Sequence, residues 1–415
     1  MYSNSLTVEL VNKIIIIWEI YLSKNKSIER WIVVTGAVLL QVCLGAIYTW
    51  SLFNQPLIDK FGWDLDATVR TYSIAIAVFA FTTIFSGRLQ DKIGPRLVAT
   101  IGAVCYGSGL ILTSMVTELW QLYLSYSVLG GIGVGFAYVC PLATCVKWFP
   151  KKKGFITGIA VGAFGLGSFV FKSVIIELIG SVGVSETFLY LGIVYLIIGG
   201  FGAQLLKLPT CESLISQGNP SHKKNFRIRE MVRTRSFYYI IVMYLFACIS
   251  GLLVIGYAKD IGVELAGLSL SVAANTVAII ALFNAGGRLI WGTLSDKIGR
   301  EKSIFFMFLI TTIGMVVLAF LELHLVSYFA SVSAIAFCFG GFLAVFPTVT
   351  SDYYGIKTMG KNYGVVYQAY GIAALLGPVI KHAVGDYTVT FIIAAITAFI
   401  GAILTLFVKS PQKDI

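Results

Sequence analysis

Twelve apolar stretches follow one another along this chain, and each is about as long as a helix that crosses a lipid bilayer. Such a helix needs roughly 20 predominantly apolar residues. The stretches cover residues 31–53, 69–87, 97–116, 122–146, 154–178 and 187–206, then 236–258, 268–292, 303–323, 325–347, 361–384 and 387–408. The sequence therefore predicts an all-α membrane protein with twelve transmembrane helices and short connections.

Charged side chains are too scarce to coat a soluble globule of this size. Asp, Glu, Lys and Arg make up 12% of the 415 residues, and apolar types make up 57%. A soluble domain carries about 25% charged and about 45–50% apolar residues. Soluble enzymes and nucleic-acid-binding proteins are therefore excluded, and the net charge of +11 has to be interpreted from its placement between the apolar stretches.

Most basic residues fall on one side of the predicted membrane. Of the 31 lysines and arginines, 25 lie in the tails and in the connections after every second span, five lie on the opposite side, and Arg288 lies on neither. Because basic connections stay in the cytoplasm, both termini are expected on the cytoplasmic side of the cell membrane. The predicted parts are a cytoplasmic tail, a first six-helix half, a cytoplasmic linker, a second six-helix half and a C-terminal tail, at residues 1–30, 31–206, 207–235, 236–408 and 409–415.

The sequence offers no signal peptide, metal site or nucleotide site. The run Ile14–Trp18 is interrupted by Glu19 and lacks a cleavage site, so the first 30 residues are expected to be an interfacial or disordered tail. The seven cysteines and three histidines show no metal-ligand spacing, so no metal and no cofactor are expected. Gly355–Asn362 matches the pattern of a phosphate-binding loop except at its last position, where asparagine replaces the serine or threonine that would contact magnesium, so no nucleotide site is expected. A membrane enzyme would need a catalytic nucleophile or a metal cluster. The sequence shows no pattern for either, so no enzymatic activity is expected.

An internal repeat divides the chain into two related halves. Residues 87–96 have the sequence GRLQDKIGPR and residues 292–300 have the sequence GTLSDKIGR, with G-x-L-x-D-K-I-G shared at an offset of 205 residues. The offset is about half of the chain length, and each copy follows the second span of its half. Two pseudo-symmetric six-helix halves, related by an axis along the membrane normal, are expected from such a repeat.

This repeated loop, G-x-x-x-D-[KR]-x-G-x-[RK], resembles the signature of the major facilitator superfamily. Further stretches are similar to the oxalate:formate antiporter family, over essentially residues 31–408: they are Lys147–Gly154, Phe283–Gly292, Phe346–Asp352 and Asn362–Gly364. The resemblance implies the major facilitator fold and a secondary transporter.

The two copies of the loop are predicted to act as gates. Asp91 and Asp296 lie beside helix ends and basic residues, where charge pairs can lock and release the cytoplasmic faces of the halves. The predicted gating residues are Gly87, Asp91, Arg96, Gly292, Asp296 and Arg300. The alternative is that the basic residues only anchor lipid headgroups. Glycines spaced four apart in the fifth span, from Gly154 to Gly162, allow close helix contact for either sliding or static packing.

One charge lies deep inside the predicted membrane. Arg288 precedes Asp296 by eight residues, which is about 12 Å along a helix. A cation at such depth costs about 2.5–3.5 kcal/mol on insertion scales, and the 20 acidic residues all lie in the tail, in loops or at helix ends. Arg288 is therefore expected to face a water-filled cavity and to bind a substrate carboxylate through two parallel hydrogen bonds. The alternative is a structural arginine that snorkels inward.

In the resembling family, this arginine binds the substrate beside a lysine of the eleventh span and aromatic side chains. The lysine position corresponds to Tyr370, so a dianion such as oxalate would leave one carboxylate without a charge partner. Asn284 shares the helix face of Arg288 and would orient the guanidinium or the ligand. The cavity aromatics correspond to Tyr48, Tyr138, Phe164, Phe339 and Tyr367; packing in the core or against lipid is the alternative for each.

Together these features favour an alternating-access carrier of a small monocarboxylate, such as formate, lactate or pyruvate, by exchange or symport. Closing an empty site over an unpaired cation is unfavourable in a low dielectric, which favours exchange. An oxalate:formate antiporter, a carrier-derived sensor and a passive anion channel are the alternatives. The expected partners are the carboxylate and membrane lipids, without nucleic acid, and the carrier is expected to function as a monomer.

Overall fold

The computed structural model describes residues 28–209 and 224–414, and this part of the chain is almost entirely helical. Most of the predicted tail and of the predicted linker lies outside the described residues. The first span is the helical stretch Ile28–Thr49, which ends in the 3-10 helix η1 (Ala46–Thr49). The first half continues with α2 (Ser51–Phe61), α3 (Leu65–Ile93), α4 (Pro95–Thr113), α5 (Leu119–Leu122), the π-helix η2 (Tyr123–Gly130), α6 (Gly131–Trp148), α7 (Lys153–Val182) and α8 (Val184–Gln204).

The second half repeats this plan. Its elements are α10 (Ile228–Met231), α11 (Arg235–Glu264), α12 (Leu270–Ile298), α13 (Arg300–Phe320), α14 (Leu325–Tyr354), α15 (Met359–Val366), α16 (Gln368–Val384), α17 (Tyr387–Phe407) and η3 (Pro411–Asp414). Ten helical stretches of the described residues are long and apolar enough to cross a membrane. Helix α12, and α15 together with α16, cover the two remaining predicted stretches, so the expected fold class is confirmed.

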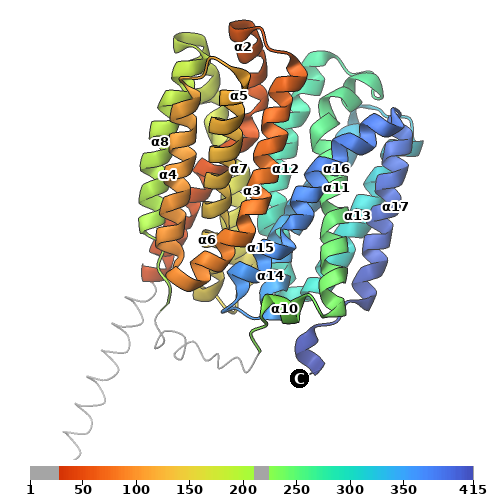
Figure 1. The fold of residues 1–415 in the computed structure, drawn as a ribbon. Coiled ribbons are helices and arrows are strands. Elements are labelled where there is room, and N and C mark those ends of the chain that lie inside the picture. The colour runs from red at the N-terminus through yellow and green to blue at the C-terminus, as the bar shows by residue number, and fades with distance from the viewer. Residues whose placement is uncertain (1–27, 210–223, 415) are drawn as a thin grey trace, which may run out of the picture.

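Helix packing shows the relation between the halves (Figure 1). In the first half α3 packs against α6, and α4 packs against α6 and α8; in the second, α12 packs against α14, and α13 packs against α14 and α17. These are equivalent pairs under the internal repeat. The halves meet mainly along two interfaces: α7 packs against α12 and α14, and α3 packs against α15 and α16. The two halves therefore share one internal architecture and touch through a small set of helices.

The repeated glycine ends the second helix of each half. Helices α3 and α12 extend beyond the predicted apolar stretches, to Ile93 and Ile298, because a helix can continue through polar residues once it leaves the lipid. Gly94 and Gly299 follow with φ values of 94° and 97°, a region that strongly favours glycine. The chain then turns directly into α4 and α13.

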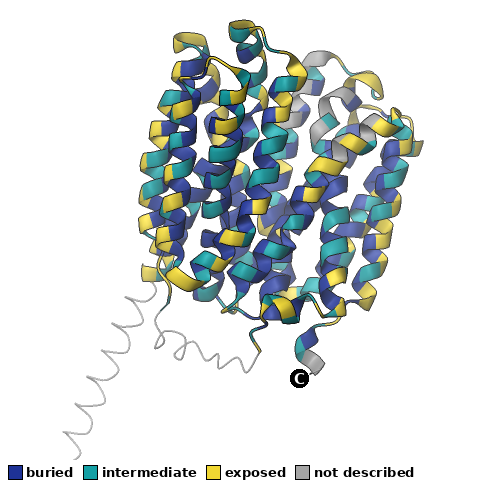
Figure 2. Ribbon diagram, viewed as in Figure 1, coloured by how far each residue is buried: buried dark blue, intermediate teal, exposed yellow. Residues whose placement is uncertain are grey.

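Buried residues concentrate inside the bundle, while exposed residues lie on its outer faces (Figure 2). Many of the exposed residues are large and apolar: Phe81 and Leu406, for example, are 59% and 67% exposed, as expected of a surface that faces lipid. The connections predicted to be cytoplasmic lie at one end, with α10 and the C-terminal segment, at the bottom of Figure 1. We call this end the basic end.

Candidate functional site

Arg288 belongs to α12, and its guanidinium lies in the core of the protein, because the residue is only 2% exposed. Its Nε donates a hydrogen bond to Oδ1 of Asn284 at 2.9 Å, and its Nη1 donates to the carbonyl oxygen of Val161 on α7. Both acceptors are neutral. The hydroxyl of Tyr48 is a third neutral partner, within hydrogen-bonding range of the guanidinium. A guanidinium carries five N–H donors, and these contacts use only part of them. Among the described residues no carboxylate pairs with Arg288, so a substrate carboxylate could accept from its charged end.

Asn284 fixes the orientation of this arginine. The two residues are four positions apart on α12, which brings their side chains together on one face. The Nδ2 of Asn284 donates to the carbonyl of Ala336 on α14 at 3.4 Å, so its Oδ1 is the atom left to accept from Arg288. Of the two roles predicted for this amide, the geometry fits orientation of the guanidinium.

Five of the predicted site aromatics form one cluster between the halves. Ring centroids lie 5.2 Å apart for Tyr48 and Phe164, 5.2 Å for Tyr138 and Phe164, 5.0 Å for Tyr138 and Tyr367, and 5.0 Å for Tyr367 and Tyr370. Tyr48 and Tyr138 also lie within electrostatic range of Arg288. Elements η1, α6 and α7 of one half and the α15–α16 segment of the other thus contribute to one aromatic wall.

A pair of tyrosine hydroxyls joins the halves beside this wall. The oxygens of Tyr48 and Tyr370 are 2.8 Å apart. Tyr48 lies in η1, where the first span departs from the α-helix, and Tyr370 lies one turn after the break between α15 and α16 at Tyr367. Because one hydroxyl must donate to the other, the pair retains a single hydrogen for any further acceptor.

The structure separates one predicted aromatic from the cluster and adds others. The ring of Phe339 packs against Gly251 of α11, where a Cβ would lie 2.2 Å from the ring, and Phe339 makes no ring contact with the cluster among the described residues. Phe79 packs on Tyr138 at 5.1 Å, and the Tyr244 and Tyr363 hydroxyls lie 3.4 Å apart. The sequence could have predicted Tyr363 as a cluster residue, because it precedes Tyr367 by one helical turn. No sequence pattern points to Phe79 or Tyr244.

At the basic end, Asp91 reaches across to the second half. Its Oδ2 accepts a hydrogen bond from the backbone N–H of Lys361, in the first turn of α15, at 3.0 Å. Its Oδ1 pairs with Nζ of Lys147 on α6 at 3.2 Å. A Cβ on Gly87 would lie 2.2 Å from the carbonyl oxygen of Gly360, so glycine allows this contact between α3 and α15.

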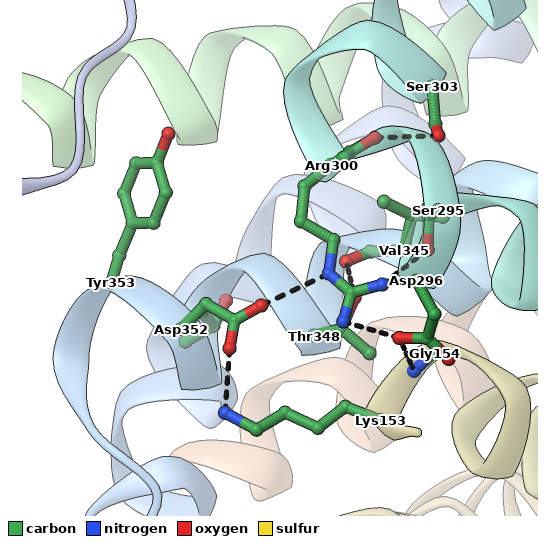
Figure 3. A network of polar contacts seen from close by, with 12 residues as sticks. Lys153, Gly154, Ser295, Asp296, Arg300, Ser303, Val345, Thr348, Asp352 and Tyr353 are labelled. Carbon is green, nitrogen blue, oxygen red and sulfur yellow. Dashed lines mark hydrogen bonds and ion pairs between the residues drawn. The ribbon is translucent and has the colours of Figure 1, made fainter. Parts of the chain in front are cut away.

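Asp296 makes the equivalent contact in the opposite direction (Figure 3). Its Oδ1 and Oδ2 accept hydrogen bonds from the backbone N–H groups of Gly154 and Phe155, both at 2.9 Å, in the first turn of α7. Nη2 of Arg300 lies 2.6 Å from Oδ1. A Cβ on Gly292 would lie 2.4 Å from the carbonyl oxygen of Gly154. Each aspartate therefore caps the positive end of a helix that belongs to the other half.

Two further charges, on Lys153 and Asp352, extend the contacts of Asp296 and Arg300. Nε of Arg300 donates to Asp352 on α14 at 3.0 Å, and Asp352 pairs with Lys153 of α7 at 2.6 Å (Figure 3). Lys153 and Asp352 lie in stretches similar to the oxalate:formate antiporter family, but the sequence pattern predicts no gating role for either. Arg96, a predicted gating residue, does not pair with Asp91: it is exposed at the start of α4, and Lys147 pairs with Asp91 instead.

Comparisons with known proteins agree with this architecture. A family model described as Major Facilitator Superfamily matches residues 35–378 and 267–414. An uncharacterized MFS-type transporter, YhjX, of Escherichia coli is 38% identical over 85% of this chain and 87% of its own. The oxalate:formate antiporter of Oxalobacter formigenes is 30% identical over 92% and 91%, and monocarboxylate transporter 12 of Rattus norvegicus 25% identical over 92% and 86%.

The fold also matches solved structures. The fucose:proton symporter FucP of E. coli aligns with a TM-score of 0.70 at 14% sequence identity, over 91% of this chain and 98% of the symporter. At this identity the match concerns the fold alone.

Proposed function

Because this chain belongs to the major facilitator superfamily, whose members among its relatives are transporters rather than enzymes, we propose that it carries small carboxylates across the cell membrane by alternating access. The observation that carries this proposal is the guanidinium of Arg288, buried between the halves and contacted by the neutral groups of Asn284, Val161 and Tyr48. Its unused N–H groups suit an anion that visits the site. A planar carboxylate accepts two such hydrogen bonds side by side.

The substrate class that fits this site best is a monocarboxylate such as formate, lactate or pyruvate. Arg288 is the single cation near the aromatic cluster among the described residues, and Tyr370 offers a hydroxyl where a second cation would be needed for a dianion. Burying a second carboxylate without a charge partner is strongly unfavourable. The name of the Rattus norvegicus relative, a monocarboxylate transporter, supports the same class.

Oxalate exchange against formate is the second candidate. It is favoured by the Oxalobacter formigenes relative, whose name is oxalate:formate antiporter and which is 30% identical to this chain. The two candidates differ in the number of carboxylates that the site must accept, so competition between oxalate and formate separates them.

The transport cycle that we propose opens and closes the basic end through the two aspartate caps. In the described conformation both caps hold the halves together. Opening this end requires the Asp91 and Asp296 contacts to break, and the other end then closes over the loaded site. A loaded site encloses a neutralised pair, which favours exchange over the return of an empty carrier.

We propose that the basic end faces the cytoplasm, with both termini inside. On this proposal the chain consists of a tail (1–30), two halves (31–206 and 236–408), a linker (207–235) and a final tail (409–415). The excess of lysine and arginine at this end supports the orientation.

Counterflow into liposomes tests the proposed function. Purified carrier is reconstituted with one unlabelled acid inside, and uptake of labelled formate, lactate, pyruvate or oxalate is followed over time. We expect saturable uptake of at least one monocarboxylate that rises when the same acid is loaded inside. Uptake that does not saturate would indicate a channel, binding without uptake would indicate a sensor, and a clear preference for oxalate would support the second candidate.

Replacing Tyr370 with lysine is expected to shift selectivity toward dicarboxylates. The new ammonium would lie within reach of Tyr48, beside the aromatic cluster, and could pair with a second carboxylate. We expect the ratio of oxalate uptake to formate uptake to rise about tenfold, the effect of one additional charge-assisted hydrogen bond. Tyr370→Phe is the control, because it removes the hydroxyl pair without adding a charge. An equal change in both variants would contradict this prediction.

A further inference from the structure

The Arg288 guanidinium is held partly by the other half of the molecule. Arg288 belongs to α12, whereas the carbonyl of Val161, which accepts from its Nη1, belongs to α7. Asn284 fixes Nε from the arginine's own helix. Two helices from different halves therefore determine together where the charged end of the side chain points.

Gly165, one turn along α7 from Val161, makes room for this contact. A Cβ at this position would lie 2.9 Å from both Cζ and Nη1 of Arg288, which is closer than side-chain carbons approach other atoms. The space that a side chain would fill is thus occupied by the guanidinium itself. The group in the way is the far end of a flexible side chain, so it can move aside without disturbing the helices.

Two neighbouring glycines of α7 meet different surroundings. A Cβ on Gly158 would lie 2.5 Å from the backbone carbonyl oxygen of Arg288, so a side chain there would push α7 and α12 apart. A Cβ on Gly162 would have nothing within 4 Å. Only Gly165, among these three, touches the functional end of the arginine.

We propose that Gly165 is a positioning residue for the substrate anion, acting through Arg288. With the Val161 carbonyl it forms a seat that holds the guanidinium so that its unused N–H groups meet the carboxylate. The inference rests on the proposed function and adds to it: the strength of anion binding is set by a glycine in the half that does not carry the arginine. A side chain at this position would rotate the fork and misalign its two hydrogen bonds.

The test compares Gly165→Ala with Gly162→Ala in reconstituted carrier. Both substitutions add one methyl group to α7 and raise its helix propensity equally, so they are matched. For the monocarboxylate that the unmodified carrier takes up best, we expect Gly165→Ala to raise the half-saturation concentration about tenfold, the loss of one well-aligned charge-assisted hydrogen bond. The maximal rate should change less than twofold, and Gly162→Ala should match the unmodified carrier.

Arg288→Lys provides the second measurement. Because Gly165 acts through the guanidinium, it has no such effect once the guanidinium is gone. The double variant Gly165→Ala, Arg288→Lys should therefore have the same half-saturation concentration as Arg288→Lys alone. Equal half-saturation in Gly165→Ala, Gly162→Ala and the unmodified carrier would overturn the inference, as would a Gly165→Ala carrier that fails to fold or loses only its maximal rate. The proposed function fails separately, if the unmodified carrier takes up none of the tested carboxylates, so the two failures are distinguishable.

Discussion

Carriers in which Arg288 is replaced by glutamine are expected to lose carboxylate transport, with initial counterflow rates at least about a hundredfold below the unmodified protein. Removing one partner of a buried ion pair costs about 3–5 kcal/mol, and each 1.4 kcal/mol corresponds to a factor of about ten. Glutamine keeps a polar side chain at this depth but has neither the positive charge nor the two parallel N–H donors of the guanidinium. The measurement is initial uptake of labelled formate and lactate in liposomes.

Lysine at the same position should fall between glutamine and arginine. Its ammonium keeps the charge but cannot present two parallel N–H groups, and it must also serve the acceptors on Asn284 and Val161. Lys172→Gln is the matched control, because Lys172 is an exposed cation of α7 that lies about 12 Å along the helix beyond Phe164 of the aromatic cluster. Unchanged transport by the Arg288→Gln carrier would show that the guanidinium is structural.

Substrate binding can be followed independently of transport. A ligand that binds only the folded protein raises its unfolding temperature, because it adds a stabilising free energy that grows with the logarithm of ligand concentration above the Kd. Formate or lactate should therefore stabilise the unmodified carrier in detergent and have no such effect on Arg288→Gln. This comparison separates a loss of binding from a loss of movement.

Neutralising Asp296 is expected to have the opposite profile, a slower cycle with normal binding. The Asp296→Asn side chain loses its charge beside Arg300, and its Nδ2 would face the N–H group of Gly154 or Phe155. Both the ion pair and the cap of α7 are weakened, which favours opening of the basic end. We expect the exchange rate to fall about tenfold or more while the half-saturation concentration stays within twofold.

Amine labelling reports the opening directly. The side chain of Lys153 is 8% exposed in the described conformation, whereas that of Lys207, also at the basic end, is 54% exposed. An amine-reactive reagent should modify Lys153 faster in Asp296→Asn than in the unmodified carrier and modify Lys207 equally in both. Asp91→Asn should show a smaller effect, because Asp91 accepts one backbone N–H across the interface and Asp296 accepts two. Equal labelling of Lys153 in all three proteins would contradict the gate.

Several site residues could be predicted because their signal lies in a few neighbouring positions. Arg288 stands out as a cation in an apolar stretch, and Asn284 follows from helical spacing. Asp91 and Asp296 follow from a repeated local pattern. In each case the physical cause, the cost of burying charge or the periodicity of a helix, acts over a few residues and is visible in the sequence.

Other site residues depend on contacts between distant segments. Arg96 lies near Asp91 in sequence, but the turn at Gly94 places it on the exposed side of α4, and Lys147 takes the contact. Phe339 has the residue type of a cavity aromatic, yet the rotation of α14 directs it against Gly251. Phe79 joins the cluster through a contact between α3 and α6, and the Lys153–Asp352 pair forms only when the halves come together.

The order of apolar stretches determined by itself that this chain lies in lipid as twelve helices, and the repeat determined that it has two related halves. The cost of exposing backbone polar groups to lipid leaves helices as the solution for such stretches. Tertiary structure alone decided which aspartate caps which helix and that Val161 and Gly165 seat the guanidinium of Arg288. These contacts join residues more than a hundred positions apart, and their geometry depends on how helices of two halves rotate and approach, which no local pattern records.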